Sequence, residues 1–108
     1  MEVQGIWFDL LVSGIKPIEG RKKTTKWAML RVNQILEATC KETREVRLFR
    51  ITHINEYEDL IEYLICEGLN RCLPGINSME EAIAIYQQWS TPEELNEYKF
   101  LAIGMHVI

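Results

Sequence analysis

The 108-residue sequence predicts an α+β fold in which helices pack against a small curled sheet. Strand-like segments rich in apolar residues occupy much of the first half of the chain and its end, and amphipathic segments with helical spacing lie between them. No repeat, low-complexity tract or long linker interrupts this order. We expect one domain over residues 1–108, because a chain of this length leaves no room for a second core.

The first predicted elements are a short helix and a strand. Apolar residues at helical spacing predict a helix over residues 6–13, and Gly14 suits the left-handed backbone at its end. A strand is predicted over residues 16–21, because Pro17 biases Lys16 away from helical backbone. Lys16 therefore lies at a corner between a helix and a strand.

A hairpin follows. Residues 27–32 mix apolar and basic side chains and are expected to lead into a strand over 34–40. The polar segment 41–44 then predicts a turn, and the Val, Leu, Phe and Ile of residues 45–54 predict the second strand of the pair.

Two helices are predicted in the second half of the chain. Apolar residues recur at helical spacing over 57–69, and acidic residues occupy the first turns, where the helix dipole favours them. Ser78 followed by Glu81 predicts a capping box that opens a helix over 79–89.

The end of the chain returns to the sheet. Thr91 and Pro92 predict the cap and first position of a short helical turn. The apolar segment 99–108 predicts the closing strand.

The composition excludes several classes of protein. Hydrophobic residues make up 47% of the chain and charged residues 26%, as in ordinary globular proteins, and the longest apolar runs are too short to cross a bilayer. No signal-peptide pattern opens the sequence, so we expect a cytoplasmic or nuclear protein with no membrane partner. Cys40, Cys66 and Cys72 form no CxxC pair, and reduced thiols are therefore expected, with no metal site and no other cofactor.

The net charge of −4 hides a strong asymmetry along the chain. Residues 1–50 hold ten Lys or Arg against six Asp or Glu, whereas residues 51–108 hold two against ten. The total charge argues against indiscriminate binding of polyanions, but a local basic patch still attracts phosphate.

Positive charge concentrates around one carboxylate in "SGIKPIEGRKKTTK", residues 13–26. Glu19 and Arg21 are two residues apart and therefore share one strand face. One interpretation is a surface salt-bridge cluster of little energetic consequence. The other is a polar pocket in which Lys supplies a point charge, Arg a bidentate fork, and Glu a hydrogen-bond acceptor or general base. Spacing alone does not decide between them.

A family resemblance favours the pocket. "SGIKPIEGR" resembles the signature of the ASCH (activating signal cointegrator homology) domain, Gly-x-Lys-Thr-x-Glu-x-Arg after a short helix, and Gly14, Lys16, Glu19 and Arg21 match it. The segment around "LPG" is similar to the helix–LPG–helix part of many members, and "KFLAIGMHVI" is similar to their closing strand. The resemblance thus covers nearly the whole chain.

This resemblance implies a PUA-like fold, a small β-barrel flanked by helices, with a cleft beside the signature. It also implies RNA binding, since that is the role of the family, while some members are hydrolases acting on modified nucleosides or are ribonucleases. Carried over by residue, Lys16, Glu19 and Arg21 would line the cleft, with Gly14 setting the corner.

The sequence departs from the signature in two respects that bear on activity. Pro17 replaces the usual Thr, and Asn33-Gln34 stands where many members have Gly-Asp. Bacterial members that deacetylate N4-acetylcytidine use a Lys, a Thr and a Glu. Lys16 matches their Lys, Glu19 occupies the Thr position, and Glu67 is the nearest candidate for their Glu.

We therefore expect a module that binds RNA or recognises a nucleotide, and the alternative is a hydrolase acting on an acylated cytidine or on RNA, with Lys16 and Glu19 as catalytic residues. The residues expected to bind RNA or phosphate are Lys16, Glu19, Arg21, Lys22, Lys23, Lys26 and Trp27. Trp27 is included because it adjoins the basic run and can stack on a base, whereas Trp7 and Trp89 fit core or rim positions better.

A third hypothesis assigns a protein partner to the acidic helices of residues 57–97. It predicts an exposed apolar patch among the acidic residues.

Overall fold

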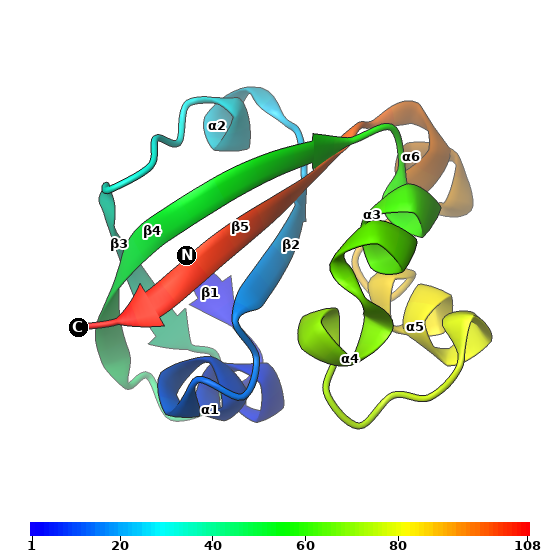
Figure 1. Cartoon of the computed structure of the whole chain (residues 1–108). Helices are drawn as coiled ribbons and strands as arrows, with labels where there is room; N and C mark the ends of the chain where they lie inside the picture. Colours follow the sequence, from blue (N-terminus) through cyan, green and yellow to red (C-terminus); the bar gives the residue numbers. More distant parts are fainter.

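Five strands form one mixed sheet in the order β1-β3-β4-β5-β2 (Figure 1). The computed structural model describes residues 1–108. β1 pairs in parallel with β3, whereas all other neighbours are antiparallel. The predicted α+β class with a curled mixed sheet is confirmed. The strands are β1 (Glu2–Val3), β2 (Ile18–Lys22), β3 (Ile35–Cys40), β4 (Val46–Tyr57) and β5 (Phe100–Val107).

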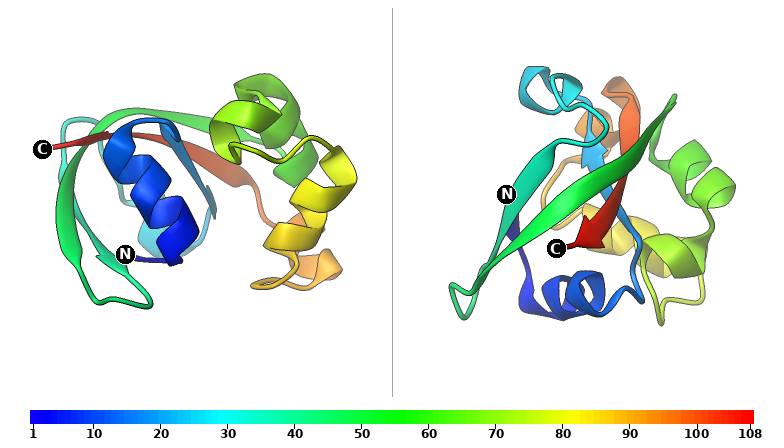
Figure 2. Two further views of the ribbon diagram at one scale, coloured as in Figure 1. Left: turned by 90° about the horizontal axis from the view of Figure 1, so that it is seen from below. Right: turned by 60° about the vertical axis from the view of Figure 1, so that its left-hand side comes forward.

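The sheet curls into a half-barrel whose edge strands are β1 and β2 (Figure 2). β4 is long enough to pair with both β3 and β5, and its register shifts between Ile51 and His53, where a bulge increases the local bend. Helix α1 (Gly5–Ser13) lies across one end of the curl and ends at Gly14, which has the expected left-handed backbone with φ of 83°.

The remaining helices are short, and most of them gather on one side of the sheet (Figure 1). Their starts follow local sequence signals, because Asp59 accepts a hydrogen bond from the Glu62 backbone and Ser78 accepts one from the Glu81 backbone. They are α2 (Thr25–Ala28), α3 (Leu60–Glu67), α4 (Leu69–Cys72), α5 (Met79–Tyr86) and α6 (Pro92–Glu97). None of them is long and apolar enough to cross a membrane.

The core joins the inner face of the sheet to α1, α3 and α5, and its largest fully buried side chains include Tyr63, Phe8, Phe49 and Phe100. β2 runs directly against Tyr63, because a Cβ added at Gly20 would lie 2.5 Å from the Tyr63 hydroxyl. Only glycine permits this approach. The contact fixes β2 against the helices and so places the residues on either side of Gly20.

Several local expectations need correction, and one strand was not predicted. The sequence shows no local strand signal for β1, because Glu2 and Val3 form a strand only where the fold brings β3 beside them. The first long strand begins at Ile18, after Pro17, rather than at residue 16. Residues 25–28 form α2 rather than a lead-in to a strand, with Thr24 at the extended N-cap position.

The helices also differ from expectation, first in the segment predicted as one helix over 57–69. Tyr57 continues β4, Asp59 caps α3, and Gly68 with φ of 93° separates α3 from α4. α5 also ends earlier than expected, at Tyr86. The complete capping box lies at the start of α6, where Thr91 and Glu94 bond reciprocally, and not at the start of α5, where only the Ser78 bond forms.

Candidate functional site

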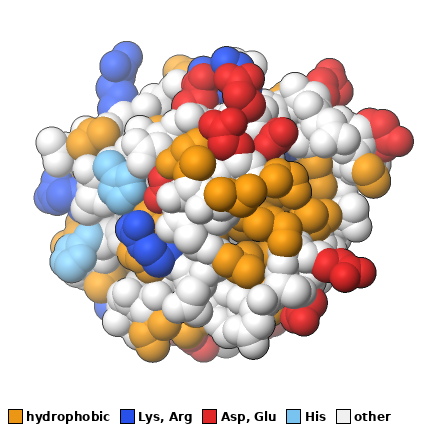
Figure 3. Space-filling view, turned by 45° about the vertical axis from the view of Figure 1, so that its right-hand side comes forward, with side chains coloured by type: hydrophobic (Ala, Val, Ile, Leu, Met, Phe, Trp, Pro, Cys, Tyr) orange, Lys and Arg blue, Asp and Glu red, His pale blue; other side chains and the backbone are white.

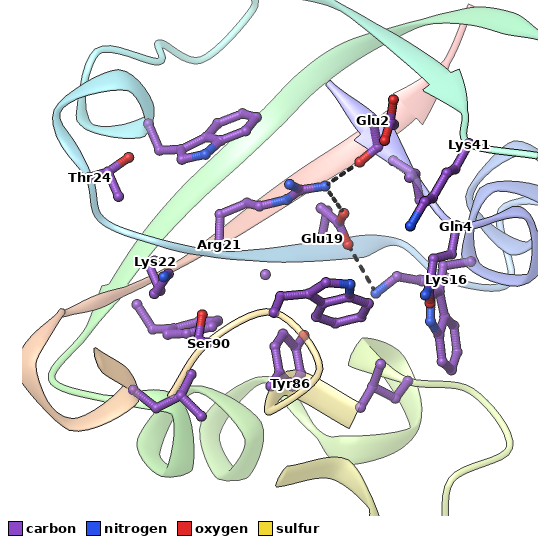
Figure 4. A pocket seen from close by; sticks show the side chains of 18 residues that line it. Glu2, Gln4, Lys16, Glu19, Arg21, Lys22, Thr24, Lys41, Tyr86 and Ser90 are labelled. Atoms are coloured by element: carbon purple, nitrogen blue, oxygen red, sulfur yellow. Dashed lines mark hydrogen bonds and ion pairs between the residues drawn. The ribbon is translucent and has the colours of Figure 1, made fainter. Parts of the chain in front are cut away.

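A cavity of about 310 Å³ opens between the two edge strands and the segment that joins α5 to α6 (Figure 4). Its volume is near the lower end of the range of about 300–1,000 Å³ that is typical of ligand pockets. Glu19 and Arg21 of β2 line it, together with Glu2 of β1 and with Tyr86 and Ser90 on the helical side. The cavity therefore lies at the open side of the half-barrel.

Lys16 lies at the inner wall of this cavity and is only 1% exposed. Its ammonium donates hydrogen bonds to the backbone carbonyls of Ile18, at 2.6 Å, and Cys72, and it lies 3.5 Å from Glu19 Oε1. These three acceptors match the three N–H groups of an ammonium. Burial lowers the pKa of Lys16, and the Glu19 carboxylate opposes that shift.

Glu19 is held between two cations. Arg21 Nη2 donates to Glu19 Oε2 at 2.8 Å and to the Glu2 backbone carbonyl at 3.1 Å, so that the guanidinium links the two edge strands. Burial favours the neutral form of Glu19, but Arg21 and Lys16 outweigh it and hold the pKa of Glu19 below its ordinary value. Glu19 is thus an ionised carboxylate at neutral pH.

Arg21 keeps binding capacity after these contacts. A guanidinium has five N–H groups, and the two hydrogen bonds of Arg21 within the protein both start from Nη2. The Nη1 and Nε donors have no protein partner. The Trp27 ring covers one side of the guanidinium, with its centroid 5.1 Å from Arg21 Cζ. Arg21 can therefore donate to an anion or to a carbonyl group of a ligand in the cavity.

All three tryptophans of the chain line this one cavity. Trp7 comes from α1, with its ring centroid 5.8 Å from Lys16 Nζ, and Trp27 comes from α2. Trp89 follows α5 and is 48% exposed. Sequence reasoning placed only Trp27 at the site, because Trp7 and Trp89 fit core or rim positions and no local pattern marks them as ligand contacts.

The basic run divides between the cavity and other surfaces. Lys22 lines the cavity but pairs with Glu94 at 3.1 Å. Lys23 forms an ion pair with Glu56 and does not line the cavity. Lys26 also lies outside it, with its ammonium 4.9 Å from the centroid of the Trp27 ring. The acidic half of the chain thus neutralises part of the basic segment.

Lys41 is a cation that sequence reasoning missed. It lies in the turn between β3 and β4, is exposed, lines the cavity and forms no ion pair. Its place in a polar turn gives no sign of this role, since the curl of the sheet brings the turn to the cavity.

Glu67 lies apart from the other candidate residues. It is 6% exposed, and it accepts hydrogen bonds from Asn55 Nδ2 at 3.0 Å and from the Tyr57 hydroxyl. It does not line the cavity that holds Lys16 and Glu19. No group of three or more His, Cys, Asp or Glu side chains is arranged to hold a metal ion.

The curled mixed sheet with helices against it defines a small α+β domain of the half-barrel type, with a charged and aromatic cavity at its open side. The family model of the ASCH domain matches residues 1–108, so the chain belongs to the ASCH family. This membership favours binding of RNA or a related nucleic acid as the function.

Two solved structures resemble the fold. The crystal structure of hypothetical protein PH0355 superposes with a TM-score of 0.87 at 28% identity, covering 100% of this chain and 96% of that one. The solution structure of protein PF0455 from Pyrococcus furiosus has a TM-score of 0.75 at 26% identity, covering 100% and 98%. Comparison with curated proteins gives no match.

Proposed function

We propose that this protein binds single-stranded RNA, or a nucleotide, by taking one unpaired base into the cavity. The observation that carries the proposal is the convergence of Trp7, Trp27 and Trp89 on a space that also contains Glu19 and Arg21. Aromatic rings stack on any base, at about 1–3 kcal/mol per base, and proteins read single-stranded RNA mainly by such stacking and by hydrogen bonds to base edges.

The charged groups supply the hydrogen bonds. Each oxygen of the Glu19 carboxylate is engaged by one cation and retains a lone pair that can accept from the amino group of a base. The unpartnered donors of Arg21 suit a base carbonyl or a phosphate. Lys41 lines the cavity without an ion pair and adds positive charge for the nucleic-acid backbone.

The alternative is a hydrolase in which Lys16 and Glu19 move protons. Three features support binding over this alternative. All three donors of the Lys16 ammonium face acceptors within the protein. The lowered pKa of Glu19 makes it a weaker base. Glu67, the candidate third residue, lies outside the cavity.

The proposal is tested by titrating the purified chain with short single-stranded RNAs and with single nucleotides, using tryptophan fluorescence and calorimetry. Trp89→Ala removes an exposed ring and should weaken binding by about 1–3 kcal/mol, the usual contribution of one stacking ring. Leu48→Ala is the matched control, because Leu48 is 45% exposed on β4 and does not line the cavity. Equal affinity of wild type and Trp89→Ala would contradict base binding in the cavity.

The same preparations decide between module and enzyme. Wild type and Glu19→Gln are incubated with N4-acylated cytidines and with short RNA, and products are separated by chromatography. We expect no turnover by either protein and a change in RNA affinity of about 1–3 kcal/mol in the variant, as for a charge-assisted hydrogen bond. Turnover by the wild type that falls by about 100-fold or more in Glu19→Gln would establish the hydrolase instead.

A further inference from the structure

A second surface combines exposed apolar side chains with a rim of carboxylates. Figure 3 shows hydrophobic side chains gathered on the face formed by the helices after β4, with acidic side chains around them. Ile61 and Ile65, one turn apart on α3, are 39% and 65% exposed. The neighbouring helices α4 and α5, which contact α3, carry three further apolar residues that are only partly buried. We call these residues the helical patch: Ile61, Ile65, Leu69, Met79 and Ile83.

The charges on these helices are almost all negative. Arg71 is the only Lys or Arg between residues 58 and 97. The carboxylates of Glu62 on α3 and of Glu80 and Glu81 in the first turn of α5 are exposed and form no ion pair. A ligand at the helical patch would therefore meet an apolar centre and a negative rim.

We propose that the helical patch binds a basic amphipathic helix of a protein partner. An apolar stripe on such a helix would cover Ile61 and Ile65, and Lys or Arg beside the stripe would meet the carboxylates of the rim. Exposed apolar area surrounded by polar residues is the mark of an interaction site, and the negative rim selects a partner of opposite charge.

The charge pattern disfavours a second copy of this chain as the occupant. A symmetric pair of helical patches would bring two acidic rims together, which is repulsive. The chain's own basic run is no better suited, because Lys22 and Lys23 already pair with Glu94 and Glu56.

This surface is separate from the RNA site. No residue of the helical patch lines the cavity, so the inference stands whether or not the cavity binds RNA. Both ligands could be bound at once, and variants of one surface should leave binding at the other unchanged.

The test uses three synthetic peptides of equal length. The first is a helical peptide with a Leu stripe flanked by Lys, the second is a scrambled peptide of the same composition without the stripe, and the third has Glu in place of Lys. Binding is measured by fluorescence anisotropy at low and physiological salt, and the contact surface is mapped by amide chemical shifts.

The first peptide should bind at least about tenfold more tightly than either of the others, with shifts confined to α3, α4 and α5. Ile65→Ser should weaken its binding by about tenfold, the effect of losing a central apolar contact. Ile6→Ser is the matched control, because Ile6 is also 65% exposed on a helix and should have no effect.

Three results would overturn the inference. Equal binding of the striped and scrambled peptides would mean that charge alone attracts them. Shifts elsewhere on the protein, or equal affinity of wild type and Ile65→Ser, would remove the helical patch as the site. Sedimentation that shows self-association lost in Ile65→Ser would make a second copy the occupant.

Discussion

The cavity and the helical patch use the same kinds of side chain in opposite arrangements. In the cavity the charged groups lie deepest, with Lys16 and Glu19 almost fully buried, whereas Trp89 is 48% exposed. In the helical patch the apolar groups of Ile61 and Ile65 face outward and the charges form the rim. A buried charge requires fixed partners, so the cavity is rigid and costly to alter, while an exposed patch is free to change at little cost to the fold.

The largest difference between the two regions should appear on removal of a buried cation. Lys16→Met leaves the carbonyls of Ile18 and Cys72 without their donor and leaves Glu19 with one cation. We expect the free energy of unfolding to fall by about 3–5 kcal/mol, as for breaking a buried ion pair. Ile65→Ser should change it by less than about 0.5 kcal/mol. Urea denaturation at pH 7 measures both, and similar losses in the two variants would erase the contrast.

A larger side chain at Gly20, which crowds β2 against the helices, should cause the next largest loss of stability. Gly20→Ala places a methyl group against the fully buried Tyr63 ring and should cost about 1–3 kcal/mol, as overpacking does. Gly20→Val should cost more, because a larger side chain increases the same clash. Thermal unfolding measures the midpoints of wild type, Gly20→Ala and Gly20→Val. An unchanged midpoint for Gly20→Ala would show that the strand can move away from Tyr63 without penalty.

Acid should lower the free energy of unfolding through protonation of Glu19. The folded pKa of Glu19 lies below its ordinary value of 4.5, so its ionised form stabilises the fold above that pH. This contribution is lost as pH falls from 4.5 through the folded pKa, because protonation then weakens the contacts with Lys16 and Arg21. Glu19→Gln should lose less stability over this interval than wild type does.

Urea midpoints at pH 7 and at acid pH measure this difference. Glu97→Gln is the control, since Glu97 is exposed on α6 and has no ion pair, and it should behave as wild type does. If Glu19→Gln loses as much stability between pH 7 and acid pH as wild type does, carboxylates other than Glu19 cause the loss.

The smallest predicted effect is on the salt dependence of RNA binding, and it distinguishes a cation that lines the cavity from one that lies outside it. Lys41→Ala should flatten the dependence of log affinity for single-stranded RNA on log salt by about 0.7, the value for one phosphate contact. Lys23→Ala should leave the slope unchanged, because Lys23 pairs with Glu56 outside the cavity. Binding isotherms across a salt series measure both slopes, and a change only in Lys23→Ala would reverse the assignment.

Local signals predicted most of the elements correctly. Gly14 ends α1, Pro92 opens α6, and apolar runs mark β4 and β5, since each of these depends on neighbours in the chain. The misplaced boundaries, such as Tyr57 in β4 rather than in a helix, arose where pairing with β5 outweighed local spacing.

The candidate site was only partly visible in the sequence. Lys16, Glu19 and Arg21 lie within six residues, but their spacing left a surface cluster possible, and the resemblance to the ASCH signature was needed to predict a shared cleft. Trp7, Trp89 and Lys41 joined them without any local sign, because the packing of α1, of the β3–β4 turn and of the segment after α5 around the cavity depends on the whole fold.

The sequence by itself therefore determined the class of fold and most of the elements, since periodicity and caps act over a few residues, and its signature pointed to the charged centre of the candidate site. Only the tertiary structure decided which cations remain free, since pairing of Lys22 with Glu94 and of Lys23 with Glu56 depends on the approach of distant segments. It also decided that three rings share one cavity and that Ile61 and Ile65 stay uncovered. Helical spacing identifies an apolar residue, but whether that residue is buried depends on how the other elements pack.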